Sequence, residues 1–462
     1  MDPTQLDAVA LGAAFRSGAL SPVEATRAVL HQVEAGAALN AFCHVATEQA
    51  LAAARASEAR HRAGMPLSAL DGVPVGIKDL LLTKGMPTRR GSLTTSPDGP
   101  WEDDAPCVAR LREAGAVLLG KTATPEFGWK GVTDSPLTGI TRNPWNPECT
   151  PGGSSGGAAV QVATGMGPIG IGTDGGGSIR IPASFTGVFG FKPSYGRVPA
   201  WPTSQVGTLA HAGPLTRTVA DAALAMAVIS GWDARDWTAL PCAKLDWMGA
   251  LQRGIAGKRI AYAPTLGGAV VDPEVAALVR AAVEVLASLG AIVEEVTPPL
   301  GVEGEAIANL WRSGCARGQR FLTPEQKALL EPALRLAAEE GAKVTLAQWQ
   351  DAMDARAALG AAMRAFHEQW DLLVLPTMKL TAFAAGQNAP LGADGQPDFA
   401  WNALCYQFNL TSQPAASIPC GLTSAGLPVG LQVVGPMHDD LGVLAACAAY
   451  ERARGKLPLP PR

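Results

Sequence analysis

Two glycine-rich stretches contain the serines most able to do chemistry in this chain. The first reads TPGGSSGG over residues 150–157, and the second reads TDGGGSIR over residues 173–180. Glycine at this density leaves backbone N–H groups unshielded and permits positive φ, so such loops can hold an anion or a developing oxyanion. Acyl transfer needs a nucleophile, a base and donors directed at the tetrahedral oxygen. Ser178 is the candidate nucleophile. The candidate oxyanion donors are the amides of Gly175, Gly176, Gly177 and Ser178.

The base is harder to assign, because none of the six histidines lies beside these loops. Folding could bring His211 close, but its place in LAHAGPL, before Pro214, is more typical of a structural histidine. Lys78 is the other choice, since it follows the apolar stretch GVPVGI and is expected to be buried at a strand end. Burial disfavours the ammonium form, so a buried lysine can be neutral and accept a proton. Ser154 could carry the proton of Ser178 to Lys78 and return it to the leaving amine.

Each of these features has an ordinary explanation when taken alone. A GGSSGG string is common in flexible turns and linkers. A single lysine is usually at the surface or paired with a carboxylate. Their combination favours an acyl-transfer site, because the two loops and Lys78 then serve one reaction.

A third motif points to different chemistry and is rejected. Residues 115–122 read GAVLLGKT and match the phosphate-binding pattern GxxxxGK[ST]. That pattern requires a strand before the loop and a helix after it. Here the helix-like VARLREAG comes first, AVLL resembles a strand, and Pro125 follows soon after Lys121. The sequence therefore predicts that Lys121 ends a buried strand.

The elements that must position these residues follow from periodicity and capping. Residues 1–65 are predicted to be helical, with a capping box at Ser21-Pro22-Val23-Glu24 and a second helix over 46–62. Residues 66–230 form the core. RIAYA, a helix over about 273–289 and AIVEEV indicate a β-α-β unit with parallel strands. Helices follow over 323–370, and DLLVLP, ASIPC and LPVGLQVVG are predicted strands before a last helix near 439–452.

Composition bounds the function. Of the 462 residues, 47% are hydrophobic and 17% charged, and the net charge of −4 contains no long run of one sign. Nucleic acid and anionic membranes are therefore poor partners, and a small neutral molecule is favoured. The eight cysteines lack a CxxC pair and are expected to be reduced, and no metal or cofactor site is visible. The N-terminal residues show no basic segment before an apolar run, so we expect a cytoplasmic protein of undetermined oligomeric state.

In Lys78 and the two serine-containing glycine loops, the chain resembles the amidase signature family. The span 71–190 reproduces the family's order of a lysine, GGSSGG and a GGS nucleophile, and FNLTSQPAASIPCG and GLPVGLQVVG extend the resemblance over nearly the whole chain. The resemblance implies that Ser178 is the nucleophile, that Ser154 bridges through a cis peptide, and that Lys78 is the base. It further implies supporting roles for Ser155, Thr173, Asp174 and Arg180, the arginine acting through Asp174 or nearby carbonyls.

The fold implied by this resemblance is α/β, with a large mixed, mostly parallel twisted sheet flanked by helices on both faces. Residues 1–462 would form a single amidase domain, with the helical region 300–400 capping the substrate pocket. The family commonly has a larger residue at the position of Gly175, so we expect a more flexible loop and a slightly wider pocket here. Candidate pocket residues are Phe127, Gly128 and Trp129 in TPEFGWKG, and Trp401, with Trp145, Trp201, Tyr406 and Phe408 as further aromatic candidates.

Two activities fit the resemblance. The first is hydrolysis of neutral apolar or aryl carboxamides, with esters and urethanes as further substrates, by an aryl-acylamidase-like or urethanase-like enzyme. The second is release of ammonia from glutamine by an amidotransferase A-type subunit. Glutamine carries both charges of an amino acid and needs charged partners in the pocket. Where glutamine-using relatives place an aspartate seven residues before the asparagine of their NL motif, this chain has Asn402 before Asn409, which favours the first activity.

Overall fold

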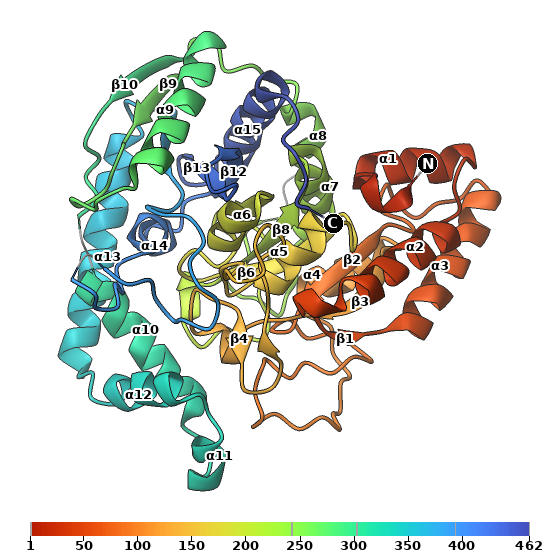
Figure 1. Ribbon diagram of the computed structural model, residues 1–462, viewed down its shortest axis with the longest axis horizontal. Coiled ribbons are helices and arrows are strands. Elements are labelled where there is room, and N and C mark those ends of the chain that lie inside the picture. The colour runs from red at the N-terminus through yellow and green to blue at the C-terminus, as the bar shows by residue number, and fades with distance from the viewer. Residues whose placement is uncertain (1, 242–243, 302–303, 393, 462) are drawn as a thin grey trace.

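A single eleven-stranded sheet runs through the computed structural model, which describes residues 2–241, 244–301, 304–392 and 394–461 (Figure 1). In spatial order its strands are β1 (Phe42–Val45), β3 (Val117–Thr122), β2 (Pro74–Lys78), β6 (Ile169–Asp174), β8 (His211–Thr216), β7 (Phe189–Lys192), β12 (Ala415–Leu422), β13 (Pro428–Val434), β11 (Leu372–Pro376), β9 (Arg259–Tyr262) and β10 (Ile292–Glu295). A separate two-stranded sheet pairs β4 (Asp134–Ser135) with β5 (Gly139–Ile140).

The sheet is mixed, as expected, but the prediction that it is mostly parallel is wrong. Four of its described strand pairs are parallel, namely β2 with β3, β2 with β6, β9 with β11 and β9 with β10. The other six are antiparallel. The predicted β-α-β unit is present, with α9 (Pro273–Ser288) between β9 and β10. The mostly parallel sheet was implied by the resemblance, whereas strands such as β12 and β13 are joined by a short turn and therefore run antiparallel.

Helices near the N-terminus cover the β1 end of the sheet (Figure 1). They are α1 (Ala8–Ser17), α2 (Pro22–Ala35) and α3 (Thr47–Arg62), after a short 3₁₀ turn η1 (Pro3–Gln5) and with η2 (Ala37–Leu39) between α2 and β1. The predicted capping box is present, because the Ser21 hydroxyl accepts the Glu24 N–H while the Glu24 carboxylate accepts the Ser21 N–H. Helix α3 packs on α2 and β3.

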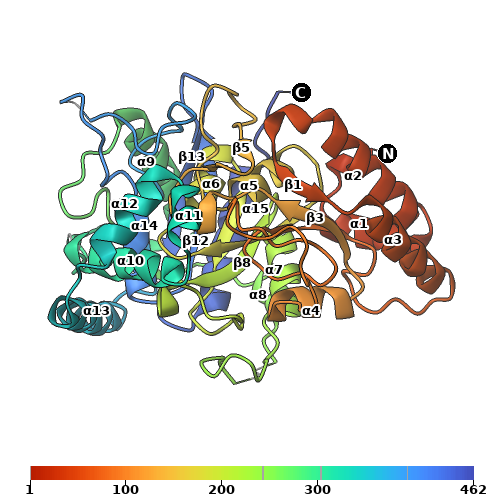
Figure 2. The same cartoon turned by 90° about the horizontal axis from the view of Figure 1, so that it is seen from below.

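The two faces of the sheet are covered by different helices, as alternation along β6 shows. Ile169 and Ile171 pack in a large core that includes α7 (Val219–Ile229) and α15 (Asp440–Arg454). Gly170 and Gly172 face α5 (Gly156–Ala163) on the opposite side, where an added Cβ would meet Ala158 at 3.0 Å and Ser155 Oγ at 2.7 Å. Figure 2 shows α5 and α6 (Arg180–Thr186) on one side, and α7 and α8 (Trp247–Ala250) on the other. The glycines thus bring the first serine loop close to the sheet.

The predicted helical region over 323–370 is present and lies at the opposite end from α1–α3 (Figure 1). Its helices are α11 (Pro324–Ala328), α12 (Pro332–Gly341) and α13 (Leu346–Phe366), preceded by α10 (Gly304–Gln319) and followed by α14 (Ala403–Leu410). Helix α10 packs on α12, α13 and α14. Short 3₁₀ turns η3 (Glu126–Gly128) and η4 (Gly207–Leu209) lie in loops of the core.

The phosphate-loop pattern at residues 115–122 is a strand, as the sequence predicted. Helix α4 (Pro106–Glu113) precedes it, β3 occupies its last six residues, and Lys121 is completely buried. The order of helix and strand is the reverse of a nucleotide site, so the match has no nucleotide-binding role here.

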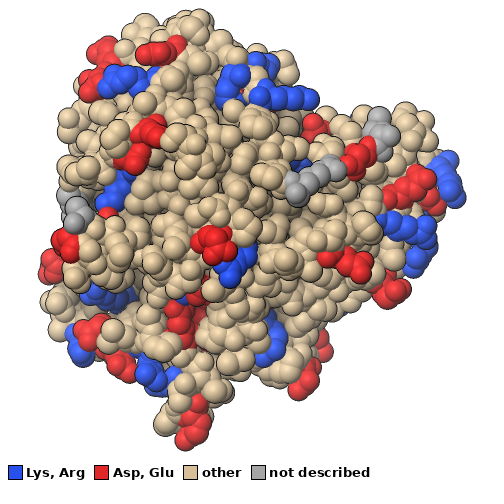
Figure 3. Space-filling view, viewed as in Figure 1, with Lys and Arg blue, Asp and Glu red and all other residues tan. Residues whose placement is uncertain are grey.

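Charge is dispersed over the molecular surface. Figure 3 shows lysine and arginine interspersed with aspartate and glutamate, without a large patch of one sign on the visible face. No helix among the described ranges is long and apolar enough to span a membrane. The cysteines of the described ranges are all free thiols, and Cys242 lies outside those ranges.

Candidate active site

Lys78 is the last residue of β2, a strand flanked on both sides by parallel neighbours, and its side chain is fully buried. Its amine is surrounded by hydroxyl groups. The Nζ atom lies 2.7 Å from Ser154 Oγ, 2.9 Å from Ser155 Oγ and 2.9 Å from Thr173 Oγ1. No carboxylate of the described residues lies within 4 Å of this nitrogen. The lysine is therefore solvated by neutral oxygen atoms in place of water.

This environment controls the charge of the lysine. Burial lowers the pKa of Lys78 well below its ordinary value, and the attraction of the Asp174 carboxylate offsets only part of that effect. A neutral amine has a lone pair and can accept a proton, whereas an ammonium cannot. Position and surroundings thus give Lys78 the protonation state that a general base requires.

The two serine loops meet beside this amine. Ser154 and Ser155 lie just before α5, and the Gly153–Ser154 peptide bond is cis, as the resemblance implied. The Ser155 N–H donates to the Ser178 carbonyl oxygen at 3.1 Å, which joins the two loops. Ser155 Oγ also donates to the Thr173 carbonyl oxygen at 3.1 Å. The predicted residues 78, 154, 155, 173 and 178 are therefore brought together from three separate stretches.

The glycine-rich loop 174–178, which contains the candidate oxyanion donors, is shaped by one buried carboxylate. Asp174 accepts the Gly177 N–H at 2.7 Å and the Ile179 N–H at 3.1 Å. Burial alone would raise the pKa of Asp174, but the adjacent Arg180 guanidinium, Lys192 and Asn409 hold it well below its usual range. A carboxylate that stays ionised keeps these amides fixed, so the loop around Ser178 is preorganised before substrate arrives.

Arg180 completes this support and is itself fully buried. Its guanidinium pairs with Asp174 through two hydrogen bonds of 2.9 and 3.0 Å. The remaining donors reach the Cys405 carbonyl oxygen at 2.8 Å, Gln432 Oε1 at 2.8 Å and Asn409 Oδ1 at 2.6 Å. Because every side of the guanidinium is bonded, Arg180 links the glycine-rich loop 174–178 to α14 and β13.

Gly177 is required by its geometry. Its φ is 117°, and an added Cβ would lie 2.6 Å from the Cβ of Cys405. No residue with a side chain fits between the loop and α14. Ser178, the next residue, is 6% exposed. Its hydroxyl forms no hydrogen bond with another described residue, whereas Ser154 Oγ is bonded to Lys78 Nζ.

Gly175 does not widen the pocket, contrary to our expectation. An added Cβ would lie 3.1 Å from Cζ3 of Trp311 and 3.4 Å from Cγ2 of Val206. The Trp311 indole of α10 therefore fills the space that a larger residue at position 175 would take. Trp311 was not a candidate from the sequence, because it lies far along the chain in an unremarkable helix.

The candidate pocket residues separate into two groups. Phe127 lines a cavity, and Gly128 lies beside Ser154, whose Oγ would be 3.3 Å from an added Cβ. Trp129 is fixed by contacts with the helical region, because its Nε1 donates to Glu331 and its carbonyl oxygen accepts the Trp311 indole N–H. Trp401 is buried, and its ring stacks on Phe185 with centroids 6.1 Å apart. Trp401 thus belongs to a buried aromatic cluster and does not line the cavity that contains Phe127, so its role in the substrate pocket stays a prediction.

Comparison with known proteins agrees with this arrangement. The Amidase family profile matches residues 24–444. The chain belongs to the Amidase family. It is 38% identical to the A-type subunit of the glutamyl-tRNA(Gln) amidotransferase of Chloroflexus aggregans, over 95% of this chain and 94% of that one. It is 36% identical to an acylamidase of Rhodococcus erythropolis, over 97% and 95%. A bacterial aryl acylamidase of the amidase signature family superposes with a TM-score of 0.90 at 33% identity, covering 97% and 96%. The protein is thus an amidase-signature amide hydrolase.

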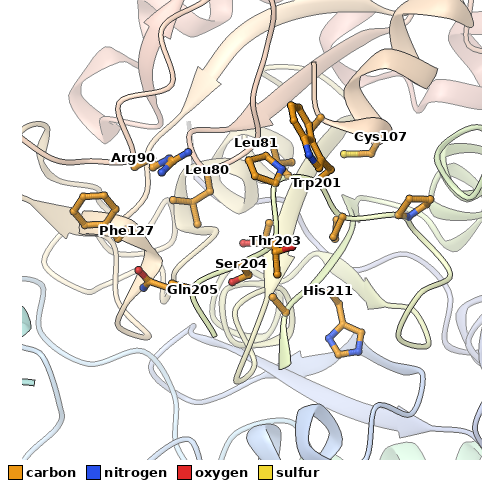
Figure 4. Close-up of a pocket in the computed structure, with 17 residues that line it drawn as sticks. Leu80, Leu81, Arg90, Cys107, Phe127, Trp201, Thr203, Ser204, Gln205 and His211 are labelled. Atoms are coloured by element: carbon orange, nitrogen blue, oxygen red, sulfur yellow. The ribbon is translucent and has the colours of Figure 1, made fainter. Parts of the chain in front are cut away.

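A cavity of about 220 Å³ lies next to the buried lysine of this amidase (Figure 4). Thr173 lines the cavity and also accepts a hydrogen bond from Lys78, so the cavity approaches the site from the β6 side. The residues labelled in Figure 4 also line the cavity: Leu80, Leu81, Arg90, Cys107, Phe127, Trp201, Thr203, Ser204, Gln205 and His211. Most of these were absent from the sequence-based set.

His211 lies opposite Asp174 in the sheet and also lines this cavity. Its Nδ1 faces the Leu209 carbonyl oxygen at 2.9 Å and the Asp174 carbonyl oxygen at 3.3 Å, and therefore carries a proton. Burial lowers the pKa of His211 well below its usual value, so the ring is neutral. It contacts neither serine hydroxyl by a hydrogen bond, which leaves Lys78 as the base supported by geometry. No three His, Cys, Asp or Glu side chains of the described ranges are grouped to hold a metal.

Proposed function

We propose that this amidase hydrolyses apolar or aryl carboxamides through an acyl-enzyme, with Ser178 as nucleophile, Ser154 as relay and Lys78 as base. The observation that carries the proposal is the Lys78 amine, fully buried and within 2.7–2.9 Å of three hydroxyl oxygens. A buried lysine with no carboxylate partner is costly for stability, and a need for a neutral amine accounts for it. The likeness to an acylamidase and an aryl acylamidase supports the substrate class.

In the proposed reaction Ser178 Oγ attacks the carbonyl carbon and its proton passes through Ser154 to Lys78 Nζ. The carbonyl oxygen becomes an oxyanion, held by the amides of Gly175, Gly176 and Ser178. The predicted donor Gly177 is excluded, because its N–H already donates to Asp174 at 2.7 Å. When the intermediate collapses, the proton returns through Ser154 to the leaving nitrogen, and the amine departs with the bonding electrons. Water then attacks the acyl-enzyme by the same proton route and releases the carboxylic acid. Esters and urethanes pass through an equivalent tetrahedral oxyanion and are expected substrates.

We further propose that the chain acts as one amidase domain in which the helical region 300–400 caps the substrate pocket. Three contacts support this. Trp311 of α10 packs against Gly175 of the oxyanion loop. Glu331, which precedes α12, accepts hydrogen bonds from Trp129 Nε1 at 2.8 Å and Lys130 Nζ at 2.7 Å. The cap is thus tied to the loop whose Gly128 lies beside Ser154.

Glutamine-dependent amidotransfer is the second candidate, favoured by the 38% identity to amidotransferase A-type subunits. In that case a partner protein would receive the ammonia. Position 402 provides no charged partner for the charged end of glutamine, because Asn402, which precedes α14, has a neutral side chain. A zwitterion buried without charged partners binds poorly, so we place this activity second.

One experiment tests these proposals together. The wild-type protein is assayed with anilide, primary amide, ester, urethane and glutamine substrates and labelled with a fluorophosphonate, followed by peptide mapping. We expect an anilide or another apolar amide as the best substrate, with the label on Ser178. Ser178→Ala should abolish both turnover and labelling. Label on a peptide without Ser178 would overturn the site, and glutamine as best substrate would establish the second candidate.

A further inference from the structure

The cavity beside Lys78 contains an arginine without a counter-ion. Arg90 lines the wall, and its guanidinium forms no hydrogen bond or ion pair with another described residue. Asp79 attracts it electrostatically, but that carboxylate is already occupied. Its oxygens accept the N–H groups of Arg89 at 3.1 Å and Gly91 at 3.2 Å, and Lys121 Nζ lies 3.9 Å away. The donors of Arg90 are therefore left for a ligand.

The local charge balance is positive. Asp79 is one carboxylate near two cations, Lys121 and Arg90, and the repulsion of Arg90 contributes to the lowered pKa of Lys121. The carboxylate of Glu126, which precedes Phe127 in the chain, is engaged elsewhere, since it accepts the Ser92 hydroxyl at 2.6 Å and the Glu331 N–H at 2.7 Å. A cavity with excess positive charge and low-dielectric walls concentrates anions.

The remaining walls suit an aromatic ring. Figure 4 shows Leu80 and Phe127 beside Arg90, with Trp201 further round and Gln205 on the same side as Phe127. An apolar cavity of about 150 Å³ is large enough to bind benzene, so about 220 Å³ admits a ring with one small substituent. A cavity that combines apolar walls, neutral polar side chains such as Gln205 and one guanidinium matches an aryl carboxylate, because the ring is desolvated while the carboxylate takes a bidentate partner.

The backbone at this wall is unusual in a way typical of ligand sites. Arg90 has φ of 55° and Phe127 has φ of 52°, both in the left-handed region that favours glycine. The two residues are joined, since the Phe127 N–H donates to the Arg90 carbonyl oxygen at 2.7 Å. Strained non-glycine residues persist where surroundings enforce them, and they cluster at binding sites. Here the strain directs both side chains into one cavity.

The position of the cavity identifies which part of a substrate it receives. In the proposed reaction the leaving nitrogen takes its proton from Ser154, so the amine half of the substrate lies on the Ser154 and Lys78 side. The acyl oxygen lies toward the loop 175–178. The cavity lies on the amine side of the substrate for two reasons. Thr173, which lines the cavity, accepts a hydrogen bond from Lys78. Phe127, which also lines it, precedes Gly128, and Gly128 lies beside Ser154.

We propose that this cavity is the leaving-group subsite and that Arg90 selects amides whose aryl amine carries a carboxylate, such as N-acyl aminobenzoates. The inference rests on the proposed function. The scissile amide remains neutral, and the charge is at the far end of the ring. Arg90 acts on specificity and takes no part in the proton transfers.

The kinetic test compares 4-acetamidobenzoate with 4-nitroacetanilide, a neutral substrate of similar shape. We expect the ratio of their kcat/KM values to fall at least tenfold in Arg90→Gln, because a hydrogen bond to a charged group is lost. Turnover of 4-nitroacetanilide should fall less than that of 4-acetamidobenzoate, because its nitro group carries no net charge for Arg90 to pair with. Arg89→Gln is the matched control, since Arg89 donates to the Thr95 carbonyl oxygen and does not line the cavity, and its ratio should equal that of wild type. An unchanged ratio in Arg90→Gln would overturn the proposal.

Binding of the product separates this proposal from the proposed function. Isothermal titration of wild type with 4-aminobenzoate should give a Kd at least tenfold lower than that of Arg90→Gln, while aniline should bind the two proteins alike. If wild type hydrolyses neither amide, the proposed function fails, and Arg90-dependent binding of 4-aminobenzoate would still establish the site. Equal affinity of both proteins for 4-aminobenzoate would refute the site even if the amides are hydrolysed.

Discussion

Two lysines on neighbouring strands show how surroundings decide what a buried amine does. Lys78 ends β2, and Lys121 lies on β3, paired in register with Ile77. Both side chains have no solvent exposure. Lys78 Nζ is close only to hydroxyl and carbonyl oxygens. Lys121 Nζ donates to the Leu81 carbonyl oxygen at 2.6 Å and also faces Asp79 at 3.9 Å.

The carboxylate makes the difference. Burial lowers the pKa of Lys121 only to about 8, because Asp79 favours the ammonium form. Burial lowers the pKa of Lys78 well below its ordinary value, and Asp174, the carboxylate that attracts its amine, is paired with Arg180. Lys121 consequently serves as a structural cation that holds the loops around Leu81 and Thr88, whose hydroxyl lies 2.7 Å from its Nζ. Burial without an ion pair does not by itself identify a catalytic lysine, because Lys192 is also fully buried and forms no ion pair with a described carboxylate. What distinguishes Lys78 is that the hydroxyls of Ser154 and Ser155 contact its amine.

The largest expected effect separates the two lysines by rate and stability. Lys78→Met should lower kcat by about 10³-fold or more, within the range for removal of a general base combined with its relay. Lys121→Met should keep kcat within about tenfold. It leaves the Asp79 carboxylate buried without its lysine, so it should cost about 3–5 kcal/mol of stability. Steady-state kinetics and calorimetric melting temperatures of both variants measure the two effects. Near-normal turnover by Lys78→Met would remove Lys78 as the base.

The pH dependence of the rate sharpens the same comparison. The folded-state pKa of Lys78 is depressed, so the reactive neutral amine is present above that pKa and is lost as pH falls through it. We expect kcat/KM to decline tenfold per pH unit on the acidic side of one ionisation that lies below 10.5, the ordinary value for lysine. The profile of Lys121→Met should have the same midpoint. A midpoint that shifts in Lys121→Met would mean that the ionisation belongs to Lys121 and not to Lys78.

The smallest effect concerns one threonine beside each amine. Thr173→Val removes a hydroxyl 2.9 Å from Lys78 Nζ, and Thr88→Val removes one 2.7 Å from Lys121 Nζ. The first should reduce kcat about tenfold, because the lysine loses an oxygen that orients it, while the second should leave kcat unchanged and lower the melting temperature. Steady-state kinetics and thermal denaturation of the two variants measure these effects on kcat and on the melting temperature. Equal rate losses would mean that both threonines act through packing.

Local features of the fold were predictable because they depend on neighbouring residues. The capping box at Ser21 and Glu24, the strand that ends at Lys78 and the unit β9-α9-β10 follow from spacing along the chain. The same local order of helix and strand showed that GAVLLGKT is not a phosphate loop. The prediction of mostly parallel strands was wrong, because the direction of a strand relative to its neighbour in the sheet depends on where the chain reverses.

Contacts between distant segments were not predictable from the sequence. Trp311 fills the space beside Gly175, and Trp401 packs in the core on Phe185. Neither outcome leaves a signal in composition or periodicity, because an aromatic residue at a helical position can face core, pocket or solvent. Arg90 likewise looks like a surface arginine until folding places it on a cavity wall without a carboxylate.

The sequence by itself determined the chemical groups available: two serines in glycine-rich loops, and a lysine at the end of an apolar strand. Their spacing sufficed to indicate acyl transfer, because loop flexibility and strand burial are local properties. Only the tertiary structure decided which hydroxyls and carboxylates approach each buried lysine, because those groups come from elsewhere in the chain. Electrostatic energies are set by distance in space, and separation along the chain does not report it.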